Sequence, residues 1–134
     1  MIDNKYTHRL KVLNVDTSPL VAYRIDFLLS DLERVDFCGT AMNIDSALQK
    51  VQSEKPDVVI MDFQLKNEGG EMNGMELLTA LRQSYPAMIL MMLTNHSEPQ
   101  YRYRCQLLGA NYFFDKTTDF SKIPGILNNI VRAN

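Results

Sequence analysis

The stretch VVIMD, residues 58–62, is the clearest indication of a buried central strand in this chain. Its four apolar residues, three of them β-branched, follow Pro56 and Asp57 and are typical of a strand buried on both faces, as in a parallel sheet. Asp62 closes the stretch at the point where the strand leaves the sheet. Ligands of open α/β sheets bind at the carboxyl ends of the strands, so Asp62 is a candidate functional residue.

Length and composition indicate one domain, residues 1–134, with a core over about residues 10–132. With 14 basic and 16 acidic residues the net charge is −2, which favours neither nucleic acid nor an anionic membrane. We find no apolar run of membrane-spanning length and no signal peptide, so we expect a cytoplasmic protein. Cys38 and Cys105 are isolated and are interpreted as free thiols in the core.

Apolar strand patterns alternate with helical stripes along the whole chain. This alternation predicts an α/β fold with three α/β/α layers around a doubly wound, five-stranded parallel sheet of order 2-1-3-4-5. Asn14 is unusual in the first strand, because a buried amide needs a hydrogen-bond partner. Residues 64–73 carry loop signals and join the third strand to a helix that begins at Gly74. The predicted strands are residues 11–16, 35–41, 58–62, 88–94 and 111–116.

Four polar residues follow or end strands of this predicted sheet: Asp16, Asp62, Thr94 and Lys116. Each of them alone is compatible with an ordinary turn or solvent-exposed residue. In the order 2-1-3-4-5 the ends of strands one and three lie side by side, so the two aspartates should meet. The four residues together therefore predict one polar site at the carboxyl edge of the sheet.

These motifs resemble the receiver domain of bacterial response regulators, which has the CheY-like fold. The resemblance rests on residues 15–19 (VDTSP), 59–62 (VIMD), 93–94 (LT) and 109–116 (GANYFFDK). It implies that Asp62 accepts a phosphoryl group, that Lys116 pairs with the phosphate, and that Thr94 and Phe113 form a conformational switch. It also implies a Mg²⁺ cofactor held by Asp16, Asp62 and the backbone carbonyl of Gln64.

An aspartate nucleophile at phosphorus requires neutralisation of the phosphoryl charge, which a divalent cation and an ammonium group supply. By the same resemblance Gln64, Asn95 and His96 control access to the phosphoryl group and its lifetime. The partners implied are a histidine kinase or phosphotransfer protein and a downstream protein target, with no nucleic acid and no membrane. The protein would be a phosphoacceptor rather than a turnover enzyme, at most catalysing its own phosphotransfer and dephosphorylation.

Several positions depart from the family pattern. Thr17 stands where the family usually has a second acid that ligates Mg²⁺, which predicts weaker metal binding. Gly74 lies 12 residues beyond Asp62, so the intervening loop is long, and Glu68 or Glu71 in it could supply the missing carboxylate. Thr117 stands where a proline frequently follows the conserved lysine.

We expect a stand-alone receiver, with no output domain after Asn134, that is a monomer or a phosphorylation-dependent dimer. Such a protein would signal by docking through the face formed by the helix at 97–109, the strand at 111–116 and the final helix. The candidates for this partner surface are Arg102, Tyr103, Arg104 and Tyr112.

Other functions remain open at this point. A pseudo-receiver, docking without phosphorylation, is supported by Thr17 but does not explain why Asp62, Thr94 and Lys116 are all present. An aspartate-based phosphohydrolase would need a second acid two residues after Asp62, where Gln64 stands. A flavin-binding domain would need a phosphate-binding loop after the first strand, and none is evident.

Overall fold

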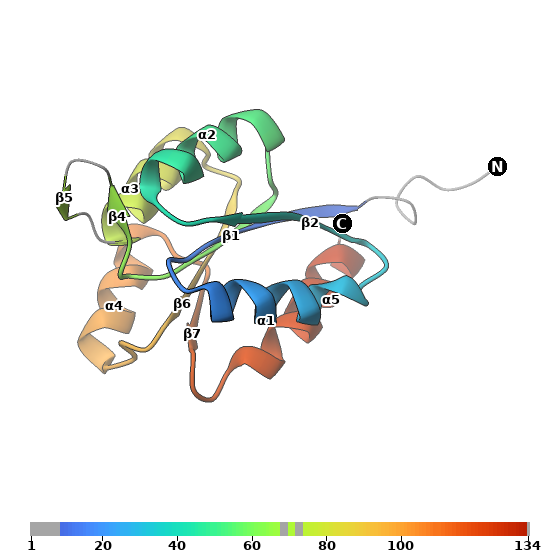
Figure 1. The fold of residues 1–134 in the computed structure, drawn as a ribbon. Coiled ribbons are helices and arrows are strands. Elements are labelled where there is room, and N and C mark those ends of the chain that lie inside the picture. The colour runs from blue at the N-terminus through green and yellow to red at the C-terminus, as the bar shows by residue number, and fades with distance from the viewer. Residues whose placement is uncertain (1–8, 68–69, 72–73, 134) are drawn as a thin grey trace.

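A computed structural model describes residues 9–67, 70–71 and 74–133 of the protein (Figure 1). The five main strands form one parallel sheet in the order β2-β1-β3-β6-β7. In chain order this is 2-1-3-4-5, so the predicted fold class and strand order are confirmed. The elements are β1 (Leu10–Val15), α1 (Pro19–Ser30), β2 (Val35–Ala41), α2 (Ile44–Glu54), β3 (Val58–Met61), β4 (Lys66–Asn67), β5 (Gly70–Glu71), α3 (Gly74–Ser84), β6 (Ile89–Thr94), α4 (Pro99–Leu108), β7 (Tyr112–Asp115), the 3-10 helix η2 (Phe120–Lys122) and α5 (Ile123–Ala133).

Two hydrophobic clusters, one on each face of the sheet, make the three layers. One cluster joins the sheet to α1 and α5, and the other joins it to α2, α3 and α4. Figure 1 shows α1 and α5 on one side of the sheet and α2 and α3 on the opposite side. None of the helices in the described part of the chain has the length and hydropathy that a bilayer crossing requires.

Strand β3 lies at the centre because both of its edges and both of its faces are covered. It pairs with β1 on one side and β6 on the other, and all four of its residues are 0% exposed. The predicted burial on both faces is therefore confirmed. Strand β2, whose mixed sequence indicated an edge position, pairs with β1 alone and is mostly half-buried.

Helix α1 begins where the sequence predicts, directly beyond the end of β1. The Ser18 hydroxyl accepts a hydrogen bond from the Val21 N–H at 3.3 Å, and Pro19 occupies the first turn, where a missing N–H costs nothing. Helix α4 also has a proline, Pro99, in its first turn, but its N-cap residue Glu98 makes no side-chain capping bond; the helix is closed by Gly109, whose φ of 109° suits glycine. The starts of α1 and α4 end the loops that follow β1 and β6 at the carboxyl edge of the sheet.

The segment 64–73 differs from the expected plain loop. It contains a short antiparallel pair, β4 and β5, in which Lys66 lies opposite Glu71 and Asn67 opposite Gly70. Local backbone pairing of this kind leaves little periodic signal, because each strand has only two residues. The proposed carboxylate from Glu68 lies outside the described residues, and the side chain of Glu71 is not described either.

Gly74 brings α3 into close contact with the chain just beyond β3. Its N–H donates to the Phe63 carbonyl oxygen at 2.6 Å, and a Cβ placed on it would lie 1.9 Å from the Asp62 carbonyl oxygen. No side chain fits at that separation, so a glycine is required here for steric reasons.

We predict that Gly74→Ala lowers the free energy of unfolding by about 1–3 kcal/mol or more, because backbone must move to admit the methyl group. The control is Gly125→Ala in α5, where a Cβ would meet nothing within 4 Å. That substitution should raise the free energy of unfolding by about 0.5–1 kcal/mol. Urea unfolding of both variants tests this, and equal effects would show that the contact at Gly74 is unimportant.

Candidate functional site

The four polar residues predicted at the strand ends lie together at the carboxyl edge of the sheet. Thr94 is the last residue of β6, whereas Asp16, Asp62 and Lys116 each directly follow a strand. Backbone hydrogen bonds continue the sheet past these ends: the Asp62 N–H donates to Val15 at 3.2 Å and the Lys116 N–H to Thr94 at 2.9 Å. Asp62 and Lys116 are therefore held in register with the neighbouring strands even though they lie beyond their own.

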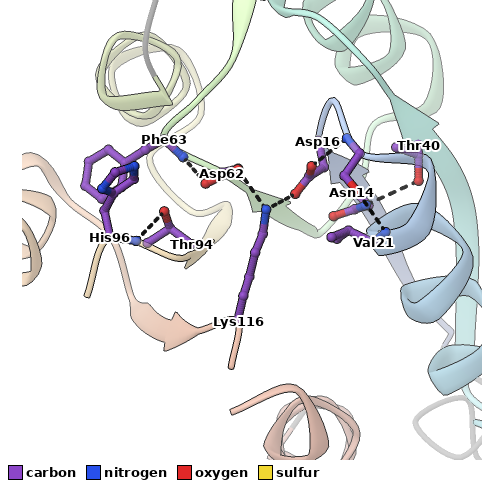
Figure 2. Close-up of polar contacts among 10 residues, drawn as sticks. Asn14, Asp16, Val21, Thr40, Asp62, Phe63, Thr94, His96 and Lys116 are labelled. Carbon is purple, nitrogen blue, oxygen red and sulfur yellow. Dashed lines mark hydrogen bonds and ion pairs between the residues drawn. The ribbon is translucent and has the colours of Figure 1, made fainter. Parts of the chain in front are cut away.

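Lys116 is the centre of the site (Figure 2). Its Nζ lies 2.8 Å from Asp62 Oδ2 and 2.9 Å from Asp16 Oδ2, and the three side chains are at most 9% exposed. The remaining carboxylate oxygens accept backbone hydrogen bonds: Asp62 Oδ1 from the Phe63 N–H at 2.7 Å and Asp16 Oδ1 from the Ser18 N–H at 2.9 Å. One buried ammonium group thus bridges two buried carboxylates from different strands.

Burial and charge act against each other on these groups. Burial raises the pKa of Asp16 above its ordinary value, and the neighbouring Lys116 and the Ser18 N–H offset part of this effect. For Lys116, burial by itself lowers the pKa, but Asp62 and Asp16 outweigh it, so the pKa is raised. Lys116 therefore stays charged and supplies a permanent positive charge at the site.

The donor set at this edge fits a hard divalent cation. Among the described residues Asn14 Oδ1 is a buried side-chain oxygen without a hydrogen-bond donor, and Asp16 Oδ2 has only its ion pair with Lys116. Two carboxylates at adjacent strand ends match the preference of Mg²⁺ for one or two carboxylates completed by water and phosphate oxygens. Thr17 is exposed and adds no carboxylate, and no cluster of three or more acidic, histidine or cysteine side chains occurs in the described ranges.

The partner that Asn14 needs is only partly present. Its amide nitrogen lies 3.3 Å from Thr40 Oγ1 on β2, while its oxygen, at 1% residue exposure, has no donor. Figure 2 shows the amide nitrogen turned toward Thr40 and the oxygen on the side of Lys116. A buried acceptor without a donor destabilises the fold unless water or a cation meets it.

An aromatic cluster lies next to Thr94, and sequence reasoning singled out only two of its four members. The Phe63 ring contacts Tyr101, His96 and Phe113 edge to face, with centroid separations of 5.3, 6.2 and 6.3 Å. Thr94 itself is fully buried, and its Oγ1 accepts a hydrogen bond from the His96 N–H at 3.2 Å. Packing therefore connects the residue after Asp62 with α4 and with the predicted switch residue Phe113.

A second feature that sequence reasoning missed is the turn that carries Lys116. The Asp115 carboxylate accepts hydrogen bonds from the Thr117 N–H at 2.7 Å and from the Thr117 hydroxyl, while Asp119 Oδ2 accepts from the Asp115 N–H at 2.8 Å. A proline at position 117 could not donate the first of these bonds. The sequence DKTTD, residues 115–119, was the available signal, since aspartate side chains commonly bind backbone two residues on.

The other predicted site residues are mostly exposed. Gln64 and Asn95 are exposed, so the proposed metal ligation by the Gln64 carbonyl and the control of phosphate lifetime by Gln64, Asn95 and His96 stay predictions. Arg102, Tyr103 and Arg104 are exposed on α4, and Tyr112 is half-buried and stacked on Phe114. Their positions allow the predicted role in partner docking.

Comparison with known proteins identifies the protein family. The family model of the response regulator receiver domain matches residues 12–128, nearly the whole chain. The chain therefore belongs to the receiver domain family of response regulators, the family that its motifs resembled.

The relatives are bacterial response regulators. The chain is 31% identical over 114 residues to the response regulator protein VraR of Staphylococcus epidermidis, covering 85% of this chain and 53% of that protein. It is 29% identical over 124 residues to VraR of Staphylococcus aureus, covering 92% of this chain and 57% of that protein. The chain thus spans about half the length of these curated relatives.

Solved structures show the same fold. The isolated REC domain of RcsB from Salmonella enterica serovar Typhimurium superposes with a TM-score of 0.85 at 18% identity, covering 93% of this chain and 90% of that chain. The response regulator domain of Thermotoga maritima CheB gives a TM-score of 0.77 at 22% identity, covering 94% of this chain and 96% of that chain.

We predict that Lys116→Met lowers the free energy of unfolding by about 3–5 kcal/mol, because it leaves two buried carboxylates without their cation. The matched control is Lys122→Met, which removes an ion pair to Asp119 from a side chain that is 64% exposed and should cost under about 1 kcal/mol. Urea unfolding of both variants at neutral pH measures the difference. Equal losses would show that the bridge between the aspartates does not hold the strand ends together.

The turn at Asp115 should make stability depend on acid pH. Hydrogen bonds from the Ser97 and Thr117 side chains and the Thr117 N–H hold the pKa of Asp115 at about 2, below its ordinary 3.8. A lowered native pKa contributes stability that is present above about pH 4 and is lost as the pH falls through 2. The stability difference between the wild type and Asp115→Asn should therefore shrink between pH 4 and 2 in urea titrations, whereas a constant difference would contradict the assigned bonds.

Proposed function

We propose that this receiver domain takes a phosphoryl group onto Asp62 from a histidine kinase or phosphotransfer protein and signals by a conformational switch. The observation that supports this best is the buried Lys116 ammonium, 2.8 Å from Asp62 Oδ2. A permanent cation beside a carboxylate nucleophile is what stabilises the added negative charge of a phosphoryl group. The proposed role is that of a cytoplasmic phosphoacceptor that turns over its own phosphoryl group, rather than of an enzyme with a separate substrate.

In the proposed transfer an Asp62 carboxylate oxygen attacks phosphorus, the phosphorus–nitrogen bond of the donor phosphohistidine breaks, and an acyl phosphate forms on Asp62. Mg²⁺, bound by the Asp16 and Asp62 carboxylates and the Gln64 carbonyl, would supply further positive charge to the phosphoryl oxygens. Lys116 would keep its bond to Asp16 or exchange it for a phosphoryl oxygen. The Asp16 carboxylate would then offset part of the positive charge that Mg²⁺ and Lys116 bring to the site.

The switch would run from Thr94 to the surface. A phosphoryl oxygen on Asp62 would accept a hydrogen bond from the Thr94 hydroxyl, and the movement of Thr94 would let Phe113 change its position. The altered surface is the face formed by α4, β7 and α5, where Arg102, Tyr103 and Tyr112 would contact a downstream protein. No nucleic acid or membrane takes part in this proposal.

The experiment is a titration with Mg²⁺ and beryllofluoride, an acyl-phosphate mimic, followed by amide NMR shifts. We predict saturable shifts around Asp62 and Thr94 that extend to Phe113, and no such shifts in Asp62→Asn. Thr17→Asp restores a second acid and should tighten Mg²⁺ binding by about tenfold or more.

Absence of NMR shifts in this titration would contradict the proposal. If the wild type shows no shifts at millimolar Mg²⁺ and beryllofluoride while its spectrum remains that of a folded protein, the phosphoacceptor role is wrong. The chain would then act as a docking module that binds its partner unmodified. Recovery of binding in Thr17→Asp would identify the missing acid as the reason.

A further inference from the structure

Arg102 on α4 contacts the predicted switch residue directly. Its guanidinium carbon lies 4.7 Å from the centroid of the Phe113 ring, within the range of a cation–π contact. The same ring meets Phe63, the residue that follows Asp62, at a centroid separation of 6.3 Å. Phe113 therefore lies between the neighbourhood of Asp62 and an exposed charge on the surface.

A hollow of about 200 Å³ opens at this place between α4 and β7. Part of its lining is apolar, from Ala110, Tyr112 and Phe113, and Arg102 contributes the charge. One turn apart on the same helix, Tyr103 and Leu107 are 62% and 68% exposed. The surface thus offers apolar area to a side chain of a partner. Beside this area lies the Arg102 guanidinium, which already contacts the Phe113 ring in the lining of the hollow.

The charges on α4 indicate what kind of partner fits. The helix sequence PQYRYRCQLL carries Arg102 and Arg104 and no acidic residue, and both arginines are exposed. A guanidinium binds a carboxylate more strongly than it binds an aromatic face, because the fork of donors matches the two oxygens. The complementary partner is an acidic peptide segment that also carries a large apolar side chain.

We propose that Arg102 is a latch between this docking surface and the switch. In the resting protein its guanidinium holds the Phe113 ring in place; an acidic peptide segment of the partner draws the guanidinium away and places an apolar side chain in the hollow. The proposal rests on the proposed function, because it takes Phe113 as the residue that the phosphoryl group repositions.

Thermodynamic linkage makes the latch work in both directions. If a phosphoryl group on Asp62 moves Phe113, Arg102 loses its ring contact and is free to bind the partner carboxylate. A partner that binds Arg102 must then favour the phosphorylated arrangement by the same factor. One exposed cation–π contact corresponds to a change of about two- to fivefold in each equilibrium.

The first test uses the unmodified protein, without metal or phosphoryl mimic. Arg102→Gln removes the charge, Arg102→Lys keeps it, and Arg104→Gln removes a neighbouring exposed charge from the same helix as a matched control. Side-chain NMR couplings report the rotamer populations of Phe113 about its first torsion. We predict a change of about two- to fivefold in the population ratio for Arg102→Gln, a smaller one for Arg102→Lys and none for Arg104→Gln.

The second test uses the peptide acetyl-Asp-Glu-Leu-Asp-Glu-Phe-amide and a counterpart with lysine at the four acidic positions. The acidic peptide should shift the resonances of Phe113 and Tyr112, bind several-fold more weakly to Arg102→Gln than to Arg104→Gln, and bind more tightly when beryllofluoride and Mg²⁺ are present. The lysine peptide should not bind.

Specific outcomes would overturn the latch. An unchanged Phe113 rotamer population in Arg102→Gln would show that the arginine does not hold the ring. Equal loss of peptide affinity in Arg102→Gln and Arg104→Gln would show that the peptide is held by general electrostatic attraction and not by Arg102 in particular. Absence of acidic-peptide binding would exclude acidic segments as the partner class. Failure of the proposed function is a separate result, namely no response of the wild type to beryllofluoride, because the rotamer measurement does not use the mimic.

Discussion

The buried ammonium of Lys116, placed between Asp16 and Asp62, holds together the edge of the sheet that carries the candidate site. It joins three strand ends that are remote in sequence, and it supplies the positive charge without which neither carboxylate could be buried at this edge as an anion. The bridge therefore does two things at once. It closes the carboxyl edge of the sheet in the resting protein, and it keeps a cation at the place where a phosphoryl group would add negative charge.

Aromatic packing connects this site with the surface. Phe63 follows Asp62 directly and contacts both Tyr101 on α4 and Phe113 on β7, while Arg102 lies over the Phe113 ring. Closely packed rings move between discrete positions rather than deforming gradually. A change at Asp62 thus has a short, continuous route of side-chain contacts to the face where a partner would dock.

The departures from the family pattern are local, and the structure accommodates each of them differently. The turn that carries Lys116 is held by Asp115 and Asp119 through hydrogen bonds that include the Thr117 N–H. The long segment after Asp62 contains a short β-pair, and Gly74 lets α3 approach the Asp62 backbone closely. The missing acid at Thr17 has no such replacement among the described residues, which leaves two carboxylates for a cation.

Sequence patterns alone predict the five strands of the main sheet, their order, the central position of residues 58–62 and the meeting of Asp16, Asp62, Thr94 and Lys116 at one edge. This prediction is possible because hydrophobic periodicity, helix capping and the residue at the end of a strand are local properties of the sequence. In addition, the connections between parallel strands allow few topologies. The Lys116 bridge, the Phe63 cluster and the contact of Arg102 with Phe113 become visible in the folded protein and not in the sequence. These depend on side-chain directions across strands and helices that are far apart in the chain, for which the sequence carries no periodic signal.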